Sequence, residues 1–305
     1  MAIASSNSGL SSSYYDRVCP EALPTIKRVV EDALAQKRRM GASLLRLQFH
    51  DCVVNGCDAS ILLDRTSTID SEKSAITNTD FVGVFPIIDK IKFEVDKVCH
   101  GLIVSCADII TVAARDSVVA LGGPSWKVKL GRRDSTSANR TAANANIASP
   151  LADLPTLIKS FKDQGLDEKD LVVLSGAHTL GSAQCLTFRD RIYNDTNIDP
   201  AFASQLRTIC PRVGGDLRHA PLDSTRHSFD VKYFTGLVSK KGLMSSDQAL
   251  FNGGETDELV LKYSRNQNEF FEDFAKSMIK MGDIQPLTGN RGQIRTNCRK
   301  VNLKN

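Results

Sequence analysis

Apolar residues recur at three- and four-residue spacing over much of the chain, which is the periodicity of amphipathic helices. Alternation of apolar and polar positions, which is typical of strands, is short and rare. The pattern therefore predicts a mostly α protein with very little β structure. We expect helices at 23–39, 43–52, 85–98, 105–121, 154–164, 167–174 and 270–281.

Three stretches interrupt this periodicity, and they are rich in Asn, Thr, Ser, Gly and Pro: 64–80, 133–152 and 211–228. We expect long surface connections there, and long loops in a compact domain often serve function. Ser105 and Asp108 have the spacing of a capping box at the start of the predicted helix 105–121.

Charge and hydropathy exclude two classes of protein. The 39 basic and 35 acidic residues give a net charge of +4. The sequence has no basic stripe with interleaved aromatic residues, which is the pattern that would indicate nucleic-acid binding. Charged residues interrupt the longest apolar region, 100–123, before it reaches the roughly 18 residues of a membrane span. The mild positive charge favours an anionic surrounding such as an acidic polysaccharide.

Cysteine usage points to the secretory route. The chain has eight cysteines and no Cys-x-x-Cys pair, so four disulfides are a simpler interpretation than zinc binding. Two glycosylation sequons, Asn139-Arg140-Thr141 and Asn194-Asp195-Thr196, agree with secretion.

Arg46 and His50 are the first candidate pair for chemistry. They lie four residues apart on a predicted helix, so both project from one face, with Phe49 beside them. An isolated pair of this kind is more often a surface arginine and a structural histidine. A base and a fixed cation in one pocket is the functional alternative, and the neighbouring sequence decides between them.

Two further groups of residues are candidates for ligand binding. Asp51, Asp58 and Ser60 supply hard oxygen atoms that suit calcium, or they belong to an Asx-rich turn closed by a Cys52–Cys57 bridge. His178 lies between small residues that leave room for a flat ligand, and the distant Asp247 could orient such a histidine.

Five motifs together resemble the class III plant peroxidases: RLQFHDC at 46–52, SCAD at 105–108, GRRD at 131–134, SGAHTLG at 175–181 and SDQALF at 246–251. The resemblance runs from about residue 10 to residue 302. It implies a single haem peroxidase domain of two helical lobes with haem b between them. The distal lobe would comprise 10–145 and 283–302, and the proximal lobe 146–282.

The same resemblance implies the reaction and its residues. The protein would reduce hydrogen peroxide to water and oxidise phenolic donors such as lignin precursors by one-electron steps. His178 would bind the haem iron and Asp247 would accept its other ring N–H. His50 would be the acid-base group, assisted by Arg46 and Phe49, while Asn78 and the Arg46 cation hold the pKa of His50 down.

Two calcium ions and four disulfides also follow from the resemblance. The distal calcium would have Asp51, Val54, Gly56, Asp58 and Ser60 as ligands, with Glu72 behind a water. The proximal calcium would be bound by Thr179, Asp223, Thr225, Ser228 and Asp230. The bridges would be Cys19–Cys99, Cys52–Cys57, Cys106–Cys298 and Cys185–Cys210, and Asp108 would pair with Arg132.

Three features depart from the family pattern. Val53 stands where the family usually has Phe, and we expect this smaller residue to alter packing more than chemistry. Ala148 stands where a proline commonly offers its carbonyl to a phenol, so the donor preference is open. The segment 222–230 is one residue shorter than the usual proximal calcium loop.

We expect a secreted monomer, extracellular or in the cell wall. Two alternatives stay open: an inactive binding protein on the same scaffold, and a zinc hydrolase with free thiols.

Overall fold

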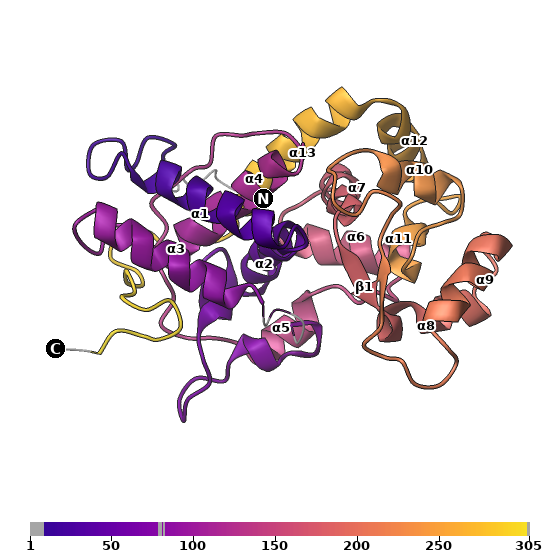
Figure 1. The fold of residues 1–305 in the computed structure, drawn as a ribbon, viewed down its shortest axis with the longest axis horizontal. Helices are drawn as coiled ribbons and strands as arrows, with labels where there is room; N and C mark the ends of the chain where they lie inside the picture. The colour runs from indigo at the N-terminus through magenta and orange to yellow at the C-terminus, as the bar shows by residue number, and fades with distance from the viewer. Residues whose placement is uncertain (1–8, 79–80, 82, 304–305) are drawn as a thin grey trace. The chain divides into compact units, whose positions relative to one another are not determined.

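Thirteen α-helices dominate the part of the chain that the computed structural model describes, which is residues 9–78, 81 and 83–303 (Figure 1). The mostly α prediction is confirmed. The helices are α1 Ala22–Gln36, α2 Met40–Asn55, α3 Phe85–Val98, α4 Cys106–Ala120, α5 Arg140–Asn146, α6 Leu154–Asp163, α7 Glu168–Ser175, α8 Cys185–Asn194, α9 Pro200–Ile209, α10 Lys232–Val238, α11 Ser245–Ala249, α12 Asp257–Arg265 and α13 Gln267–Gly282.

The chain divides into two compact units. The first comprises 1–120, 125–147 and 279–305, and the second comprises 121–124 and 148–278. None of the described helices is both long and apolar enough to cross a lipid bilayer.

In the first unit, α4 is the central helix, and α1 and α2 both pack against it. Twelve of its 15 residues are buried, from Cys106 to Val118. A helix that is apolar nearly all round belongs inside a core. α2 is therefore held on a rigid support, and α2 is the helix that contains Arg46 and His50.

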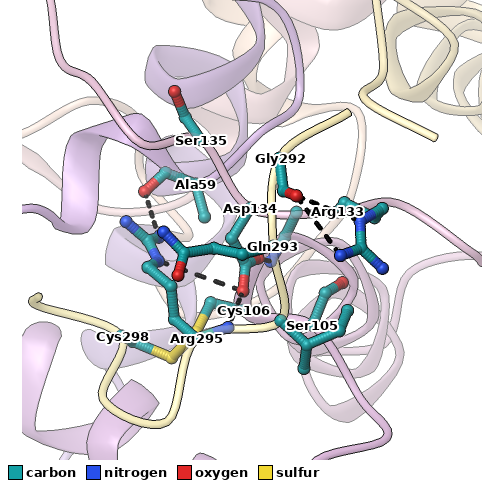
Figure 2. A network of polar contacts seen from close by, with 12 residues as sticks. Ala59, Ser105, Cys106, Arg133, Asp134, Ser135, Gly292, Gln293, Arg295 and Cys298 are labelled. Carbon is teal, nitrogen blue, oxygen red and sulfur yellow. Dashed lines mark hydrogen bonds and ion pairs between the residues drawn. A yellow bond between two sulfur atoms is a disulfide. The ribbon is translucent and has the colours of Figure 1, made fainter. Parts of the chain in front are cut away.

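The C-terminal segment of the first unit is fastened by a buried polar network (Figure 2). The Arg295 amide donates to Asp134 Oδ2 at 2.8 Å, and the Arg295 guanidinium donates to the Ala59 carbonyl at 2.6 Å. Backbone hydrogen bonds join Asp134 and Gln293 in both directions. Residues near the C-terminus therefore hold the loop that follows α2.

In the second unit, an aromatic core supports the segment around His178. Phe234 and Phe270 lie 5.0 Å apart between ring centroids, and Tyr263 lies beside both rings. A two-stranded antiparallel sheet pairs β1 Ser182–Gln184 with β2 His219–Pro221. It joins residues close in sequence to His178 with the loop that contains Asp223.

The disulfides join the same four pairs that the resemblance implies: Cys19–Cys99, Cys52–Cys57, Cys106–Cys298 and Cys185–Cys210. All eight cysteines lie in the described part of the chain, and none is free. A zinc hydrolase would need free thiols, so this alternative is wrong.

Two local expectations need correction. The stretches 64–80, 133–152 and 211–228 are not wholly irregular. The first contains the 3₁₀ helices Glu72–Ser74 and Ile76–Asn78, the second contains α5 and the third contains β2. The Asn139 side chain caps the start of α5 by accepting a hydrogen bond from the Ala142 amide at 2.9 Å. This cap was not recognised in the sequence because Asn139 lies in a stretch rich in polar residues.

The capping box at Ser105 is only half formed. The Asp108 amide donates to Ser105 Oγ at 3.1 Å, but the Asp108 carboxylate faces Tyr15, Gly131 and Arg132 instead. The predicted Asp108–Arg132 pair is confirmed at 3.0 Å. A buried guanidinium is a stronger partner for this carboxylate than a backbone amide at the helix start.

Candidate functional site

His50 lies on α2 as the centre of the first candidate group. Only 4% of its surface is exposed, and its Nδ1 atom lies 2.6 Å from Asn78 Oδ1. Asn78 is in turn oriented by its Nδ2, which donates to the Glu72 carbonyl at 2.9 Å. The described residues thus form a chain from the backbone of Glu72 through Asn78 to His50.

This chain fixes the tautomer of His50. Because a backbone carbonyl can only accept, the Asn78 atom that faces Glu72 is the amide nitrogen, and its oxygen faces His50. His50 therefore donates from Nδ1. Its Nε2 atom lies 3.0 Å from Arg46 Nε, which can only donate, so Nε2 presents a lone pair.

Arg46 is oriented by two contacts that the sequence did not predict. Its Nη2 donates to the Thr77 carbonyl at 2.6 Å, and its guanidinium lies 4.8 Å from the centroid of the Phe81 ring. Phe81 also meets the His50 ring edge to face at 5.0 Å. No periodic pattern marks Phe81 in the sequence, because it lies in an irregular stretch 31 residues after His50.

Phe49 is half-buried, and its ring lies 5.8 Å from that of His50 in an edge-to-face arrangement. The predicted residues Arg46, Phe49, His50 and Asn78 are therefore brought together in the first unit. The arrangement can do one thing chemically: Nε2 can accept a proton beside a fixed cation.

His178 and Asp247 form a second group, in the other unit. His178 Nδ1 lies 2.7 Å from Asp247 Oδ1, and Asp247 is 2% exposed. With Nδ1 engaged, Nε2 is the ring atom that can bind a ligand, and the His178 side chain is 40% exposed. An imidazole held by a buried carboxylate is a common arrangement behind a metal ligand, so this donor fits haem iron.

Gly176, two residues before His178, packs closely against the aromatic core. A Cβ atom on Gly176 would lie 2.6 Å from the Phe270 ring and 2.8 Å from Phe234. Gly176 is therefore required for packing against the aromatic core.

A cluster of buried oxygen atoms follows α2. Asp51 Oδ1, Ser60 Oγ and Glu72 Oε2 are buried and make no hydrogen bond to any described residue. Unpartnered buried oxygens cost free energy, and a hard cation would satisfy all three. The distal cluster of Asp51, Asp58, Ser60 and Glu72, with the Val54 and Gly56 carbonyls nearby in the chain, therefore fits calcium.

The pKa values in the distal cluster agree with that fit. Burial raises the pKa of Glu72 to about 7. Burial also raises the pKa of Asp51 well above its ordinary range, and the neighbouring Asp58 carboxylate adds to the effect. A bound divalent cation would reverse these shifts because it stabilises the charged carboxylates.

The five residues predicted for the proximal calcium also lie together, in the second unit. Thr179 Oγ1 is 2.7 Å from Asp223 Oδ2, 3.2 Å from Asp230 Oδ1 and 3.5 Å from the Ser228 carbonyl. Thr225 Oγ1 is 3.1 Å from the same Asp230 oxygen. The proximal cluster of Thr179, Asp223, Thr225, Ser228 and Asp230 supplies only oxygen atoms, which is the chemistry that calcium prefers.

Carboxylates alone do not make either site. Among the described residues, no three His, Cys, Asp or Glu side chains are grouped so that they could hold a metal. A cation at the distal or proximal cluster would therefore need the hydroxyl and carbonyl oxygens as well, as calcium sites usually do.

Ala148 lies in the connection between α5 and α6 and is half-buried. Nearby, the Pro150 carbonyl accepts a hydrogen bond from the Ser246 amide at 3.0 Å, which ties this connection to the start of α11. The described contacts do not bring Ala148 to either candidate group.

Comparison with known proteins agrees with these arrangements. The peroxidase family model matches residues 26–266. Peroxidase RIP1 of Medicago truncatula is 55% identical over 97% of this chain and 92% of its own length. Peroxidase 67 of Arabidopsis thaliana is 55% identical over 99% and 96%, and the lignin-forming anionic peroxidase of Nicotiana sylvestris is 56% identical over 96% and 91%. The chain therefore belongs to the class III plant peroxidases, which are haem enzymes that use peroxide as the oxidant.

Proposed function

We propose that the chain reduces hydrogen peroxide to water with haem b bound at His178 and His50 as the acid-base group, and that phenols are its electron donors. The observation that carries this proposal is the chain from Glu72 through Asn78 to His50, which leaves Nε2 of a buried histidine as a base beside Arg46. We also propose that the two units are lobes of one peroxidase domain spanning 10–302, since the family model matches residues of both.

His50 handles the protons of the reaction. Its Nε2 accepts a proton from one oxygen of hydrogen peroxide and returns it to the other oxygen, which leaves as water. Arg46 stabilises the negative charge that develops on that leaving oxygen. Asn78 keeps the Nδ1 proton in place, so only Nε2 takes part. Haem b, when bound, would supply the two electrons for the cleavage. Two phenol molecules would return these electrons one at a time, and the two protons that they release would convert the second peroxide oxygen to water.

We propose calcium at both oxygen clusters, with the ligand sets given above. The distal cluster supports this proposal because Asp51 adjoins His50 on α2. In addition, three oxygens of the cluster, on Asp51, Ser60 and Glu72, have no hydrogen-bond partner among the described residues. The proximal set supports it because Thr179 follows His178 directly. Each ion would brace a residue next to a reacting histidine.

Phenols such as lignin precursors are the proposed donors, in line with the lignin-forming relative from Nicotiana sylvestris. Ala148 is the proposed contact for the donor, through its carbonyl. An Ala148→Pro variant should change the KM for phenols while leaving the rate of peroxide reduction unchanged. A KM that stays the same for several phenols would remove Ala148 from the donor site.

We propose that the protein is a secreted monomer, extracellular or associated with acidic wall polysaccharide, and that it takes part in responses to oxidative stress. Four disulfides support an oxidising compartment, and the two sequon asparagines, Asn139 and Asn194, are exposed and accessible to glycosylation.

The test is His50→Ala in the haem-loaded protein, with the exposed His100→Ala as the matched control. The rate of the change in the Soret band after one equivalent of peroxide should fall by about 10²- to 10⁴-fold for His50→Ala. It should be unaltered for His100→Ala, and both variants should keep their haem.

Equal rates for His50→Ala and the parent protein would contradict the role of His50. A folded, calcium-loaded protein that shows no Soret band after haem is supplied would instead favour the inactive binding protein.

A further inference from the structure

Asp247 Oδ1 accepts two hydrogen bonds, and only one of them comes from His178. The His178 Nδ1 contact is 2.7 Å, and the Tyr233 hydroxyl donates to the same oxygen at 3.1 Å. The other carboxylate oxygen, Oδ2, accepts the Met244 amide at 3.0 Å. Tyr233 and His178 therefore share one acceptor atom.

Tyr233 is built into this position. It lies on α10, is 2% exposed, and its ring meets the His178 ring nearly edge to face at 6.0 Å. Burial raises the pKa of Tyr233 well above its ordinary range, and the Asp247 carboxylate adds to the effect. The hydroxyl is therefore a buried donor to Asp247 Oδ1.

We propose that Tyr233 is a positioning residue that limits how strongly Asp247 attracts the Nδ1 proton of His178, and thereby raises the reduction potential of the haem iron. The inference rests on the proposed function, because it takes His178 as the iron ligand. It adds a residue that neither the motif at 175–181 nor the motif at 246–251 contains.

The physical argument concerns electron density on one oxygen atom. A hydroxyl that donates to Asp247 Oδ1 withdraws density from it, so this oxygen attracts the His178 proton less. A weaker pull leaves the imidazole less anionic, and a less anionic ligand stabilises ferric iron less. Without the hydroxyl, the ferric form should therefore be favoured.

A matched tyrosine in the same unit serves as the control. The Tyr263 hydroxyl donates to Asp273 Oδ2 at 3.0 Å, and Tyr263 is also fully buried. Both tyrosines pack against Phe234. Tyr263→Phe therefore removes the same kind of hydrogen bond from the same aromatic core, but at a carboxylate that does not contact His178.

The experiment measures the ferric-ferrous midpoint potential and the iron–histidine stretching band of the ferrous holoprotein. In Tyr233→Phe, the ratio of ferric to ferrous protein at a fixed potential should rise about three- to tenfold, where tenfold is 59 mV for one electron. The stretching band should move to higher frequency. Tyr263→Phe should change neither quantity.

Two further variants should shift the midpoint potential and the stretching band in the opposite direction. A ring-fluorinated tyrosine at position 233 is a stronger donor of nearly the same shape, so it should favour the ferrous form and lower the band frequency. Asp247→Asn should do the same, because a neutral amide attracts the His178 proton less than a carboxylate.

The inference is overturned if Tyr233→Phe and the fluorinated protein both match the parent in potential and band, or shift in the same direction as each other. If Tyr233→Phe does not fold, the fluorinated protein alone decides. A parent protein without an iron–histidine band would instead contradict the proposed role of His178, so the two failures can be told apart.

Discussion

Asn78 Oδ1 lies 2.6 Å from His50 Nδ1, and this contact determines which nitrogen of the imidazole holds the proton. The Glu72 carbonyl fixes the Asn78 amide in turn. The state of the base is therefore set by the backbone of a residue 22 positions later in the chain, in a short 3₁₀ helix, Glu72–Ser74.

Replacing Asn78 should slow the reaction with peroxide. Asn78→Leu removes the acceptor, so His50 can hold its proton on either nitrogen and Nε2 is a base for only part of the time. We expect a fall of about 10- to 100-fold, in the range typical of residues that orient a reacting group. Stopped-flow measurement of the peroxide-dependent rate provides the check.

Asn78→Asp is the informative companion, because it keeps an acceptor for Nδ1 and should retain more activity than Asn78→Leu. The exposed Asn252→Ala is the control for loss of an amide. If Asn78→Leu reacts as fast as Asn252→Ala, Asn78 does not control the tautomer.

Breaking the Asp108–Arg132 pair should destabilise the first unit. Arg132 and Asp108 are 1% and 0% exposed, so Asp108→Ala leaves a buried guanidinium without its partner. We expect a loss of about 3–5 kcal/mol in the free energy of unfolding. Denaturant titration at fixed calcium concentration measures this loss.

The control is the exposed Lys159–Asp163 pair, for which Asp163→Ala should cost about 0.5 kcal/mol or less. The double variant Asp108→Leu with Arg132→Met should recover only part of the loss. It buries no unpaired charge, but the Tyr15 hydroxyl and the Gly131 amide still lose their acceptor. A single variant that costs no more than Asp163→Ala would show that the buried pair adds little.

Without calcium, the free energy of unfolding should fall as the pH rises. The pKa of Glu72 is raised to about 7 from 4.5, and that of Asp223 to about 6 from 3.8, both by burial. Carboxyls with pKa values higher in the folded than in the unfolded chain stabilise the fold when protonated, and this contribution is lost as pH rises.

Chelated protein should therefore lose stability between about pH 4 and pH 7, whereas calcium-loaded protein should not. The increase in Tm on adding calcium should grow over the same interval. Glu72→Gln should reduce this growth, and the exposed Glu258→Gln should leave it unchanged. A calcium effect on Tm that is independent of pH would contradict both assignments.

Arg295 should control how firmly the distal cluster holds calcium. It is fully buried and donates to the Ala59 carbonyl at 2.6 Å (Figure 2). The Asp51, Asp58 and Glu72 carboxylates all lie near enough to act on its charge. Arg295→Met frees the loop at Ala59, a residue with φ of 59°, between Asp58 and Ser60.

We expect Arg295→Met to release calcium at least several-fold faster into chelator and to unfold at lower temperature than the parent. Arg291→Gln, four residues earlier and exposed, is the control. Equal release rates for the two variants would show that the C-terminal segment does not support the calcium loop.

Local features of the sequence were sufficient for much of the fold. The helix 85–98 was predicted with its observed bounds, and α2 and α7 were located to within a few residues. Strong periodicity made this possible. Six helices were missed: α5 in the first unit and α8, α9, α10, α11 and α12 in the second. Each has ten residues or fewer, so its periodicity is too brief to recognise, and its burial depends on partners elsewhere in its unit.

The candidate residues were predicted because the motifs contain them, but a motif does not determine how each side chain is oriented. His50 and Asn78 were both predicted, but that Asn78 faces the ring with its oxygen depends on the Glu72 carbonyl. Phe81 and Tyr233 were missed, since neither lies in a motif and each reaches its partner through the packing of a separate segment.

The sequence by itself determined which chemical groups this protein possesses: its periodicity specifies helices, and its motifs supply the proposed acid-base histidine, the cation, the second histidine and the oxygen donors. The tertiary structure alone decided which atoms share a proton, because hydrogen bonds act over about 3 Å between residues that are far apart in the chain. Glu72 and Asn78 fix the proton on His50, and Tyr233 competes with His178 for one oxygen of Asp247.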